Sequence, residues 1–133
     1  MISSDTVGAL LGALDAINPD AGRLVQLSAL AARIEPEILR ALRLHFLDGA
    51  SVTAEGDVWF SGLVQARSPS TITLLDAALP PFRAWCTSDP ARLDRACAVI
   101  AKVHRRSSPL VQLEERLIHA ALKADHPGAS GRK

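Results

Sequence analysis

The chain of 133 residues is poor in aromatic side chains and has no tyrosine. Aromatic residues make up only 4% of it, too few for the stacking platforms that bind single-stranded nucleic acid. Its 15 basic and 14 acidic residues leave a net charge of +1, so the composition does not indicate a nucleic-acid or membrane partner. Long apolar runs and a basic N-terminal region are missing too, which argues against a membrane span and a secretory signal peptide. We therefore expect a cytoplasmic protein.

The sequence contains no arrangement typical of a catalytic nucleophile. Around Ser61, Trp59 occupies the position of the first glycine of a nucleophile elbow, and no strand is expected before it. Cys97 and His104 share one helical face, but at seven residues' separation they lie about 10 Å apart, beyond a hydrogen bond. We expect both cysteines, Cys86 and Cys97, to be free, buried thiols.

Metal and phosphate sites have no sequence signature either. The four histidines and two cysteines never fall at the spacing of zinc ligands. Glu115 and His119, four residues apart, are typical of a contact between helical neighbours rather than of half a metal site. A glycine-rich phosphate loop is absent. We expect no catalytic residue, no metal, no cofactor and no small-molecule substrate.

Apolar residues recur with helical spacing along most of the chain. N-cap residues or prolines mark the expected helix starts, because a proline at the first helical position loses no hydrogen bond. These signals predict an all-α fold, a compact bundle of six to seven short helices in a single domain over residues 1–125. Residues 126–133 are expected to form a flexible tail or linker. The expected helices begin at or next to Asp5, Asp20, Pro36, Asp57, Pro80, Pro90 and Pro109.

The middle of the chain contains the only β-like stretch, residues 71–75 (TITLL). A single strand without a partner cannot form a sheet, so we expect an extended connector there. Before it, Asp57 is expected to cap a short helix over residues 58–66, ended by the Ser-Pro-Ser turn at 68–70. Trp59 and Leu63, one turn apart on that helix, are expected to point into the bundle.

The last two helices have the clearest apolar faces. A joint of a few residues between them predicts an antiparallel hairpin. The face of the first is formed by Leu93, Ala96, Cys97, Ile100 and His104, and that of the second by Leu110, Leu113, Leu117 and Ala121.

A basic stripe lies opposite the apolar face of the first of these two helices. The simplest interpretation is that the stripe is the solvent-exposed face of the helix. Such a stripe could also bind an acidic partner surface or phosphates. Asp89 and Asp94 dilute its charge, and no turn-plus-recognition-helix pattern accompanies it, which favours a protein over DNA. The stripe consists of Arg92, Arg95, Lys102 and Arg106, with Arg105 adjoining.

Three stretches together resemble a known class of module: PEILRALRLHFLDGA, GDVWFSGLVQARSPSTITLL and LDRACAVIAKVHRRSSPLVQLEERL. In this order, over roughly residues 36–122, they are similar to the small helical N-terminal modules of bacterial multi-component conflict systems. Those systems combine a MoxR-type AAA ATPase, a von Willebrand factor A protein and an effector component. The resemblance implies an adaptor or recruitment domain without activity of its own, tethered to an effector such as a peptidase. Residues 1–133 hold no effector, so we expect either an excised module or a stand-alone component.

Together these observations predict a non-enzymatic protein–protein interaction module in a bacterial conflict or signalling assembly. Its partner would be another protein, for instance the ATPase or effector component of the same system. The binding surface would include exposed parts of the basic stripe and the loop expected at residues 50–56. The alternative is a small helical DNA-binding regulator that uses the stripe from Arg92 to Arg106.

Overall fold

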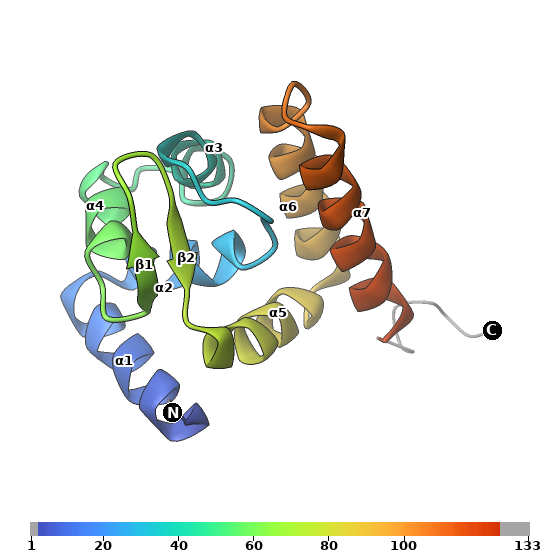
Figure 1. Cartoon of the computed structure of the whole chain (residues 1–133). Helices are drawn as coiled ribbons and strands as arrows, with labels where there is room; N and C mark the ends of the chain where they lie inside the picture. Colours follow the sequence, from blue (N-terminus) through green and yellow to red (C-terminus); the bar gives the residue numbers. More distant parts are fainter. Residues whose placement is uncertain (1–2, 126–133) are drawn as a thin grey trace.

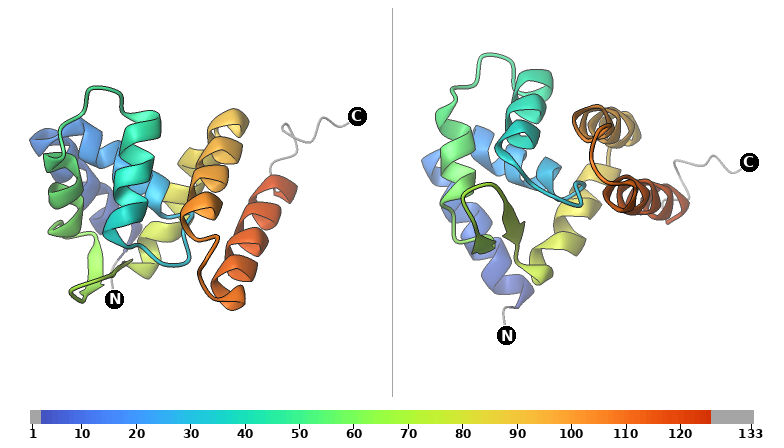
Figure 2. Two further views of the ribbon diagram at one scale, coloured as in Figure 1. Left: turned by 90° about the horizontal axis from the view of Figure 1, so that it is seen from above. Right: turned by 45° about the horizontal axis from the view of Figure 1, so that its top comes forward.

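The computed structural model describes residues 3–125, which form seven α-helices and one two-stranded hairpin (Figure 1). The prediction of a compact, mainly helical bundle is confirmed, and α6 and α7 lie side by side as the expected antiparallel hairpin (Figures 1 and 2). The tail predicted for residues 126–133 lies outside the described residues. The helices are α1 (Ser4–Ile17), α2 (Pro19–Ser28), α3 (Pro36–Phe46), α4 (Thr53–Trp59), α5 (Leu79–Thr87), α6 (Pro90–Val103) and α7 (Pro109–Ala124). The strands are β1 (Val64–Arg67) and β2 (Ile72–Leu74), and a short 3-10 turn, η1 (Asp76–Ala78), precedes α5.

All helices except α4 begin at or next to the positions that proline and capping residues predict. Proline occupies one of the first two positions of α2, α3, α5, α6 and α7. The caps of the first two helices differ from the prediction, because Ser3 and Asn18 accept the capping hydrogen bonds rather than Asp5 and Asp20. Both aspartates instead lie in the first helical turn, where a carboxylate interacts favourably with the helix dipole.

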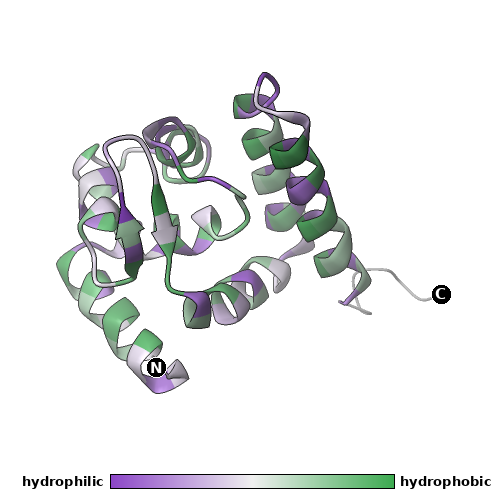
Figure 3. Ribbon diagram, viewed as in Figure 1, coloured by the Kyte–Doolittle hydropathy of each residue, from purple (hydrophilic) through white to green (hydrophobic). Residues whose placement is uncertain are grey.

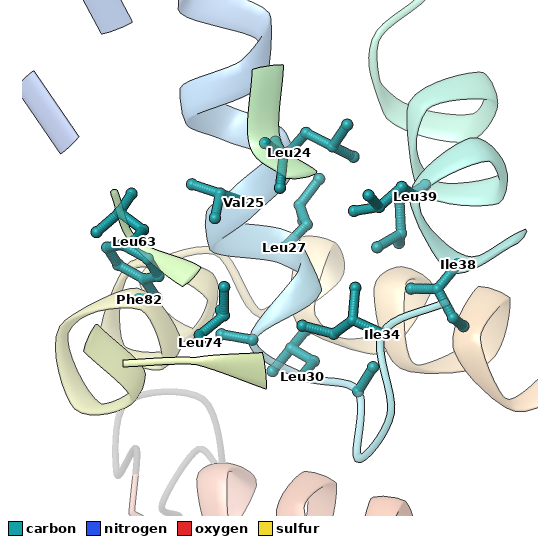
Figure 4. Packing of buried hydrophobic residues seen from close by; sticks show 14 of the residues in the cluster. Leu24, Val25, Leu27, Leu30, Ile34, Ile38, Leu39, Leu63, Leu74 and Phe82 are labelled. Atoms are coloured by element: carbon teal, nitrogen blue, oxygen red, sulfur yellow. The ribbon is translucent and has the colours of Figure 1, made fainter. Parts of the chain in front are cut away.

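The core is built around α2. This helix packs against α1, α3, α4 and α5, and its Leu24 and Leu27 are almost completely buried. Figure 4 shows these leucines between Leu39 of α3 on one side and Phe82 of α5 on the other. Full burial of one leucine side chain contributes about 1.5–3 kcal/mol, so this central layer supplies much of the stability. In residues 3–125 no helix is both long enough and apolar enough to cross a membrane.

The prediction of a helix over residues 58–66, capped by Asp57, is wrong. The observed helix, α4, begins earlier, at Thr53, and ends at Trp59. Asp57 is therefore not a cap; it lies inside α4 and accepts a hydrogen bond of 3.1 Å from the side chain that caps α2. Leu63 is fully buried as predicted, but Trp59 is only half-buried at the edge of the core.

The stretch at residues 71–75 has a partner strand after all. β1 pairs with β2 in antiparallel register, Val64 opposite Leu74, with an irregularity after Val64. The Ser68 hydroxyl accepts hydrogen bonds from the backbone N–H groups of residues 70 and 71, which fixes the tight turn between the strands. Ile72 is buried and its N–H donates to the carbonyl of Ile34, so the hairpin is joined to the loop before α3. The prediction of an unpaired connector is therefore wrong, because this stretch contains one strand of a small sheet.

The apolar stripe of α7 faces outward, contrary to the prediction. Leu110, Leu113 and Leu117 are 72%, 45% and 61% exposed. In Figure 3, where hydrophobic residues are green, green segments occur along α7, which lies at the edge of the molecule. Among the described residues of α7, Glu115 alone is buried. Helical spacing correctly indicates an apolar face here, but a different face turns toward α6.

Candidate functional site

A groove runs between α3 and α6, which lie side by side (Figure 2). The two helices run in opposite directions, because the residue before α3, Glu35, meets His104 at the end of α6, while His45 near the end of α3 meets Arg95 near the start of α6. The groove has a volume of about 530 Å³. It is lined by Ala41, Leu44, His45, Ala98, Val99, Lys102, Val103 and Arg105.

Apolar residues form most of the wall of this groove. The small side chains of Ala41 and Ala98 leave space between the helices, and Leu44 is 64% exposed beside them. An exposed leucine next to a groove is a surface that association with a partner would cover. The shape and polarity suit one apolar edge of an amphipathic segment.

The rim of the groove is cationic. Lys102 and Arg105 are both exposed and line the groove, and no lining residue is acidic. Neither side chain forms an ion pair with any of residues 3–125. Their positive charge is therefore directed to solvent and to whatever approaches the groove.

The basic stripe predicted from sequence is divided by the fold. The Arg92 guanidinium lies 3.9 Å from the centroid of the Trp85 ring and donates to the Trp85 carbonyl, so it holds α6 against α5. Arg95 lies 4.6 Å from the centroid of the Phe46 ring and contacts α3. Both contacts are cation–π interactions that stabilise helix packing. Arg95 is nevertheless exposed, and the residues of the stripe without an aromatic contact are Lys102, Arg105 and Arg106, all exposed.

The segment expected to form a loop, residues 50–56, instead contributes to the packing of α4 against α3. Its last four residues belong to α4, and Arg43 of α3 binds Glu55 at 2.6 Å and the carbonyl of Ala50 at 3.1 Å. This ion pair, whose side chains are mostly buried, connects α4 to α3. No residue of 50–56 lines the groove between α3 and α6.

A buried histidine lies at the C-terminal end of α6, between two carboxylates. His104 is 2% exposed; its Nδ1 lies 2.7 Å from Glu115 Oε2, and its Nε2 lies 2.5 Å from Glu35 Oε1. Glu115 Oε2 also accepts a hydrogen bond of 2.8 Å from the N–H of Ala32. The cluster thus joins three segments: the α2–α3 loop, the end of α6 and the middle of α7.

The two hydrogen bonds of His104 require two shared protons. A carboxylate only accepts, so either both ring nitrogens of His104 carry a proton or one of the two carboxyl groups does. Burial raises the pKa of Glu115, and this effect outweighs the lowering by the Ala32 N–H and by His104. The carboxylates contact opposite edges of the ring and do not converge on one point, and no metal-binding group of three ligands occurs in residues 3–125.

As their separation predicts, His104 does not pair with Cys97 and turns toward the two glutamates. The contact expected between Glu115 and His119 is not formed, because His119 binds Asp94 at 2.8 Å. Both cysteines are free as expected, Cys86 buried and Cys97 partly so, and burial raises the pKa of each thiol to about 12. Such thiols are poor nucleophiles, because very little thiolate exists near neutral pH.

A second apolar groove, of about 550 Å³, lies between α1 and α4. Ile17 and Phe60 border it and are 73% and 74% exposed. Its one charged lining residue, Asp57, is already hydrogen-bonded to Asn18. This groove therefore lacks the charged rim that distinguishes the groove between α3 and α6.

The chain has no detectable relative in the comparisons with known proteins: no family model, no curated protein and no solved structure matches it.

Proposed function

We propose that this protein is a non-enzymatic adaptor module that binds an acidic, amphipathic helix of another protein in the groove between α3 and α6. One observation carries the proposal: the groove combines an apolar wall, with Leu44 exposed, and a rim on which Lys102 and Arg105 are the charged residues. An apolar stripe flanked by acidic residues is the complement of such a surface.

The expected affinity is moderate. Covering Leu44 contributes at most the 1.5–3 kcal/mol of a buried leucine, and the two rim charges mainly increase the association rate and select against basic partners. Association also costs rigid-body freedom. We therefore expect dissociation constants no lower than about 10 μM for a single helix at physiological salt.

The resemblance of residues 36–122 to adaptor-type modules of bacterial conflict systems supports the same class of role. On that basis the helix would belong to the ATPase or the effector component of such a system. The absence of an activity of its own is part of the proposal. It is supported by the engagement of both His104 nitrogens by carboxylates of the same chain and by the high pKa of both thiols.

DNA binding receives less support than it does from sequence alone. Arg92 and Arg95 lie over rings of the same molecule, which leaves Lys102, Arg105 and Arg106 as the exposed basic residues of the stripe without such a contact. Three phosphate contacts would give weak and strongly salt-dependent binding.

A peptide titration tests the proposal. The probe is a helical peptide of about 20 residues with leucines on one face and glutamates beside them, and its matched control carries lysines in place of the glutamates. We expect the acidic peptide to bind at least about tenfold more tightly than the basic one. Lys102→Glu with Arg105→Glu should reverse this preference, and Leu44→Ser should weaken both. Equal binding of the two peptides, or tighter binding of a random DNA duplex with a steep loss at higher salt, would overturn the proposal.

A further inference from the structure

The outer face of α7 carries an apolar stripe that residues 3–125 leave uncovered. The helix lies at one edge of the molecule, and its opposite face packs against α6 and α5 (Figures 1 and 2). Contiguous apolar surface of this kind marks an interaction site. The members of this α7 stripe, all exposed, are Leu110, Leu113, Leu117, Ala120, Ala121 and Ala124.

The spacing of the α7 stripe is that of a coiled-coil seam. From Leu110 to Ala124, through Leu113, Leu117 and Ala120, steps of three and four residues alternate, and Ala121 lies beside this line. Such a pattern keeps apolar side chains along the line where two helices meet lengthwise. The α7 stripe is therefore suited to a second helix that lies along it.

The two borders of the α7 stripe carry opposite charges. A helix turns by about 100° per residue, which places Glu114 on one border and Arg116 and Lys123 on the other. Lys123 lies 3.4 Å from Asp94, and Arg83 interacts electrostatically with Glu114 without forming an ion pair. Glu114 and Arg116 are exposed, and neither forms an ion pair with any of residues 3–125.

These charges make the α7 stripe complementary to itself in one orientation. When two α7 helices pack in parallel about a two-fold axis, the acidic border of each faces the basic border of the other. Glu114 then meets Arg116 on both sides of the seam. An antiparallel pair would instead place each border beside its own copy, with like charges together. Residues 126–133 contain no large apolar side chain with which to cover the stripe.

We propose that two copies of this protein associate through the α7 stripe, with the two helices parallel and Glu114 of each copy paired with Arg116 of the other. The interface uses the same surface of both copies, so it closes as a dimer. This inference goes beyond the adaptor role and does not rest on it, because no residue of α7 lines the groove between α3 and α6.

The size of the α7 stripe sets the expected affinity. The stripe is about 21 Å long and about 10 Å wide, which gives less than the roughly 800 Å² per partner of a standard interface. We therefore expect a dissociation constant on the order of 100 μM, with the monomer predominant at low micromolar concentration.

Sedimentation equilibrium between about 5 μM and about 1 mM tests the dimer. We expect the average mass to rise from 14.2 kDa toward twice that value. Leu117→Ser removes a leucine from the middle of the seam and should raise the dissociation constant about tenfold or more. Leu44→Ser is the matched control, because Leu44 is similarly exposed but lies outside α7, and it should leave the dissociation constant unchanged.

Two further variants test the orientation. Glu114→Lys brings a positive charge next to Arg116 of the other copy and should raise the dissociation constant at least about fivefold. Ala120→Cys places a thiol on the seam, where the two copies of this position meet only in a parallel pair. Oxidised glutathione should therefore link two copies through it, whereas Ala101→Cys, exposed on α6, should remain unlinked.

A mass that stays at 14.2 kDa up to about 1 mM would overturn the proposal. A dimer that Leu117→Ser leaves unchanged, or that Leu44→Ser weakens equally, would do the same. An unchanged dissociation constant in Glu114→Lys, or no link through Ala120→Cys, would exclude the parallel pair. Circular dichroism at about 5 μM, where the monomer predominates, establishes that each variant is folded.

Discussion

The imidazole of His104 and the carboxylate of Glu115 form a buried contact of 2.7 Å that joins the end of α6 to the middle of α7. Glu115 is also bound by the N–H of Ala32, so the same carboxylate connects α7 to the loop after α2. Among the residues described, Glu115 is the one buried residue of α7, and the face that turns inward carries it together with the half-buried Val111, Ile118 and Leu122. The three leucines of its apolar stripe are left on the outside.

Removal of the imidazole should therefore be strongly destabilising. His104→Ala leaves the carboxylates of Glu35 and Glu115 without the group between them, and loss of one partner from a buried charged cluster costs about 3–5 kcal/mol. Urea unfolding measures this change in the free energy of unfolding. His119→Ala is the matched control, because its contact with Asp94 is exposed and should contribute less than about 1 kcal/mol. Similar small effects of both variants would show that the cluster is not important for stability.

Glu115 should make a contribution to the free energy of unfolding that decreases as the pH rises. Burial raises its folded-state pKa above the ordinary value of 4.5, so the folded state binds this proton more readily than the unfolded chain. The stability that Glu115 contributes is therefore present in full below about pH 4.5 and is lost as the pH rises through the raised pKa.

Glu115→Gln removes this titration and serves as the reference. We expect the wild-type free energy of unfolding, relative to that of the variant, to decrease between about pH 4 and pH 7. Urea unfolding at a series of pH values measures the difference. A difference that increases with pH would mean that hydrogen bonding to the carboxylate outweighs its burial.

Leucine substitutions test the orientation of α7. Leu39 is 1% exposed and Leu117 is 61% exposed. Leu39→Ala should cost about 2–5 kcal/mol, whereas Leu117→Ala should change stability by no more than about 0.5 kcal/mol. Thermal or urea unfolding compares the two. A large loss from Leu117→Ala would show that α7 turns its leucines toward the protein, as the sequence alone suggests.

The two cysteines should react very slowly in the native protein. Their pKa values of about 12 leave far less thiolate at pH 8 than an ordinary cysteine has. We expect native-state labelling by a disulfide reagent at least about 100-fold slower than labelling in urea. Rapid labelling of either thiol before unfolding would contradict the structure and would reopen the possibility of a reactive cysteine.

Local signals in the sequence predict much of the fold. Proline and capping residues mark the starts of most helices, and the short joint before Pro109 predicts the hairpin of α6 and α7. The partner of β2 is missed because Val64–Arg67 contains Gln, Ala and Arg, which have weak strand propensity. The pairing of β1 with β2 depends on the turn at residues 68–71. In the sequence, the Ser-Pro-Ser of this turn resembles the end of a helix.

The candidate site is harder to predict, because its contacts link residues that are distant in sequence. Glu35 and His104 are 69 positions apart, and no local spacing predicts their contact. The one hint is a histidine within the apolar stripe of α6. Likewise, helical spacing places Arg92 and Arg95 on a common stripe, but only the packing of α5 and α3 shows that each covers an aromatic ring.

The most direct test of the adaptor proposal is an NMR map of where the acidic amphipathic peptide binds. With labelled wild-type protein, we expect the largest shifts at Ala41, Leu44, Ala98 and Lys102, along the groove between α3 and α6. The groove between α1 and α4, followed through Ile17 and Phe60, should change little. Shifts confined to that second groove or to the leucines of α7, or no saturable shift at all, would contradict the proposal.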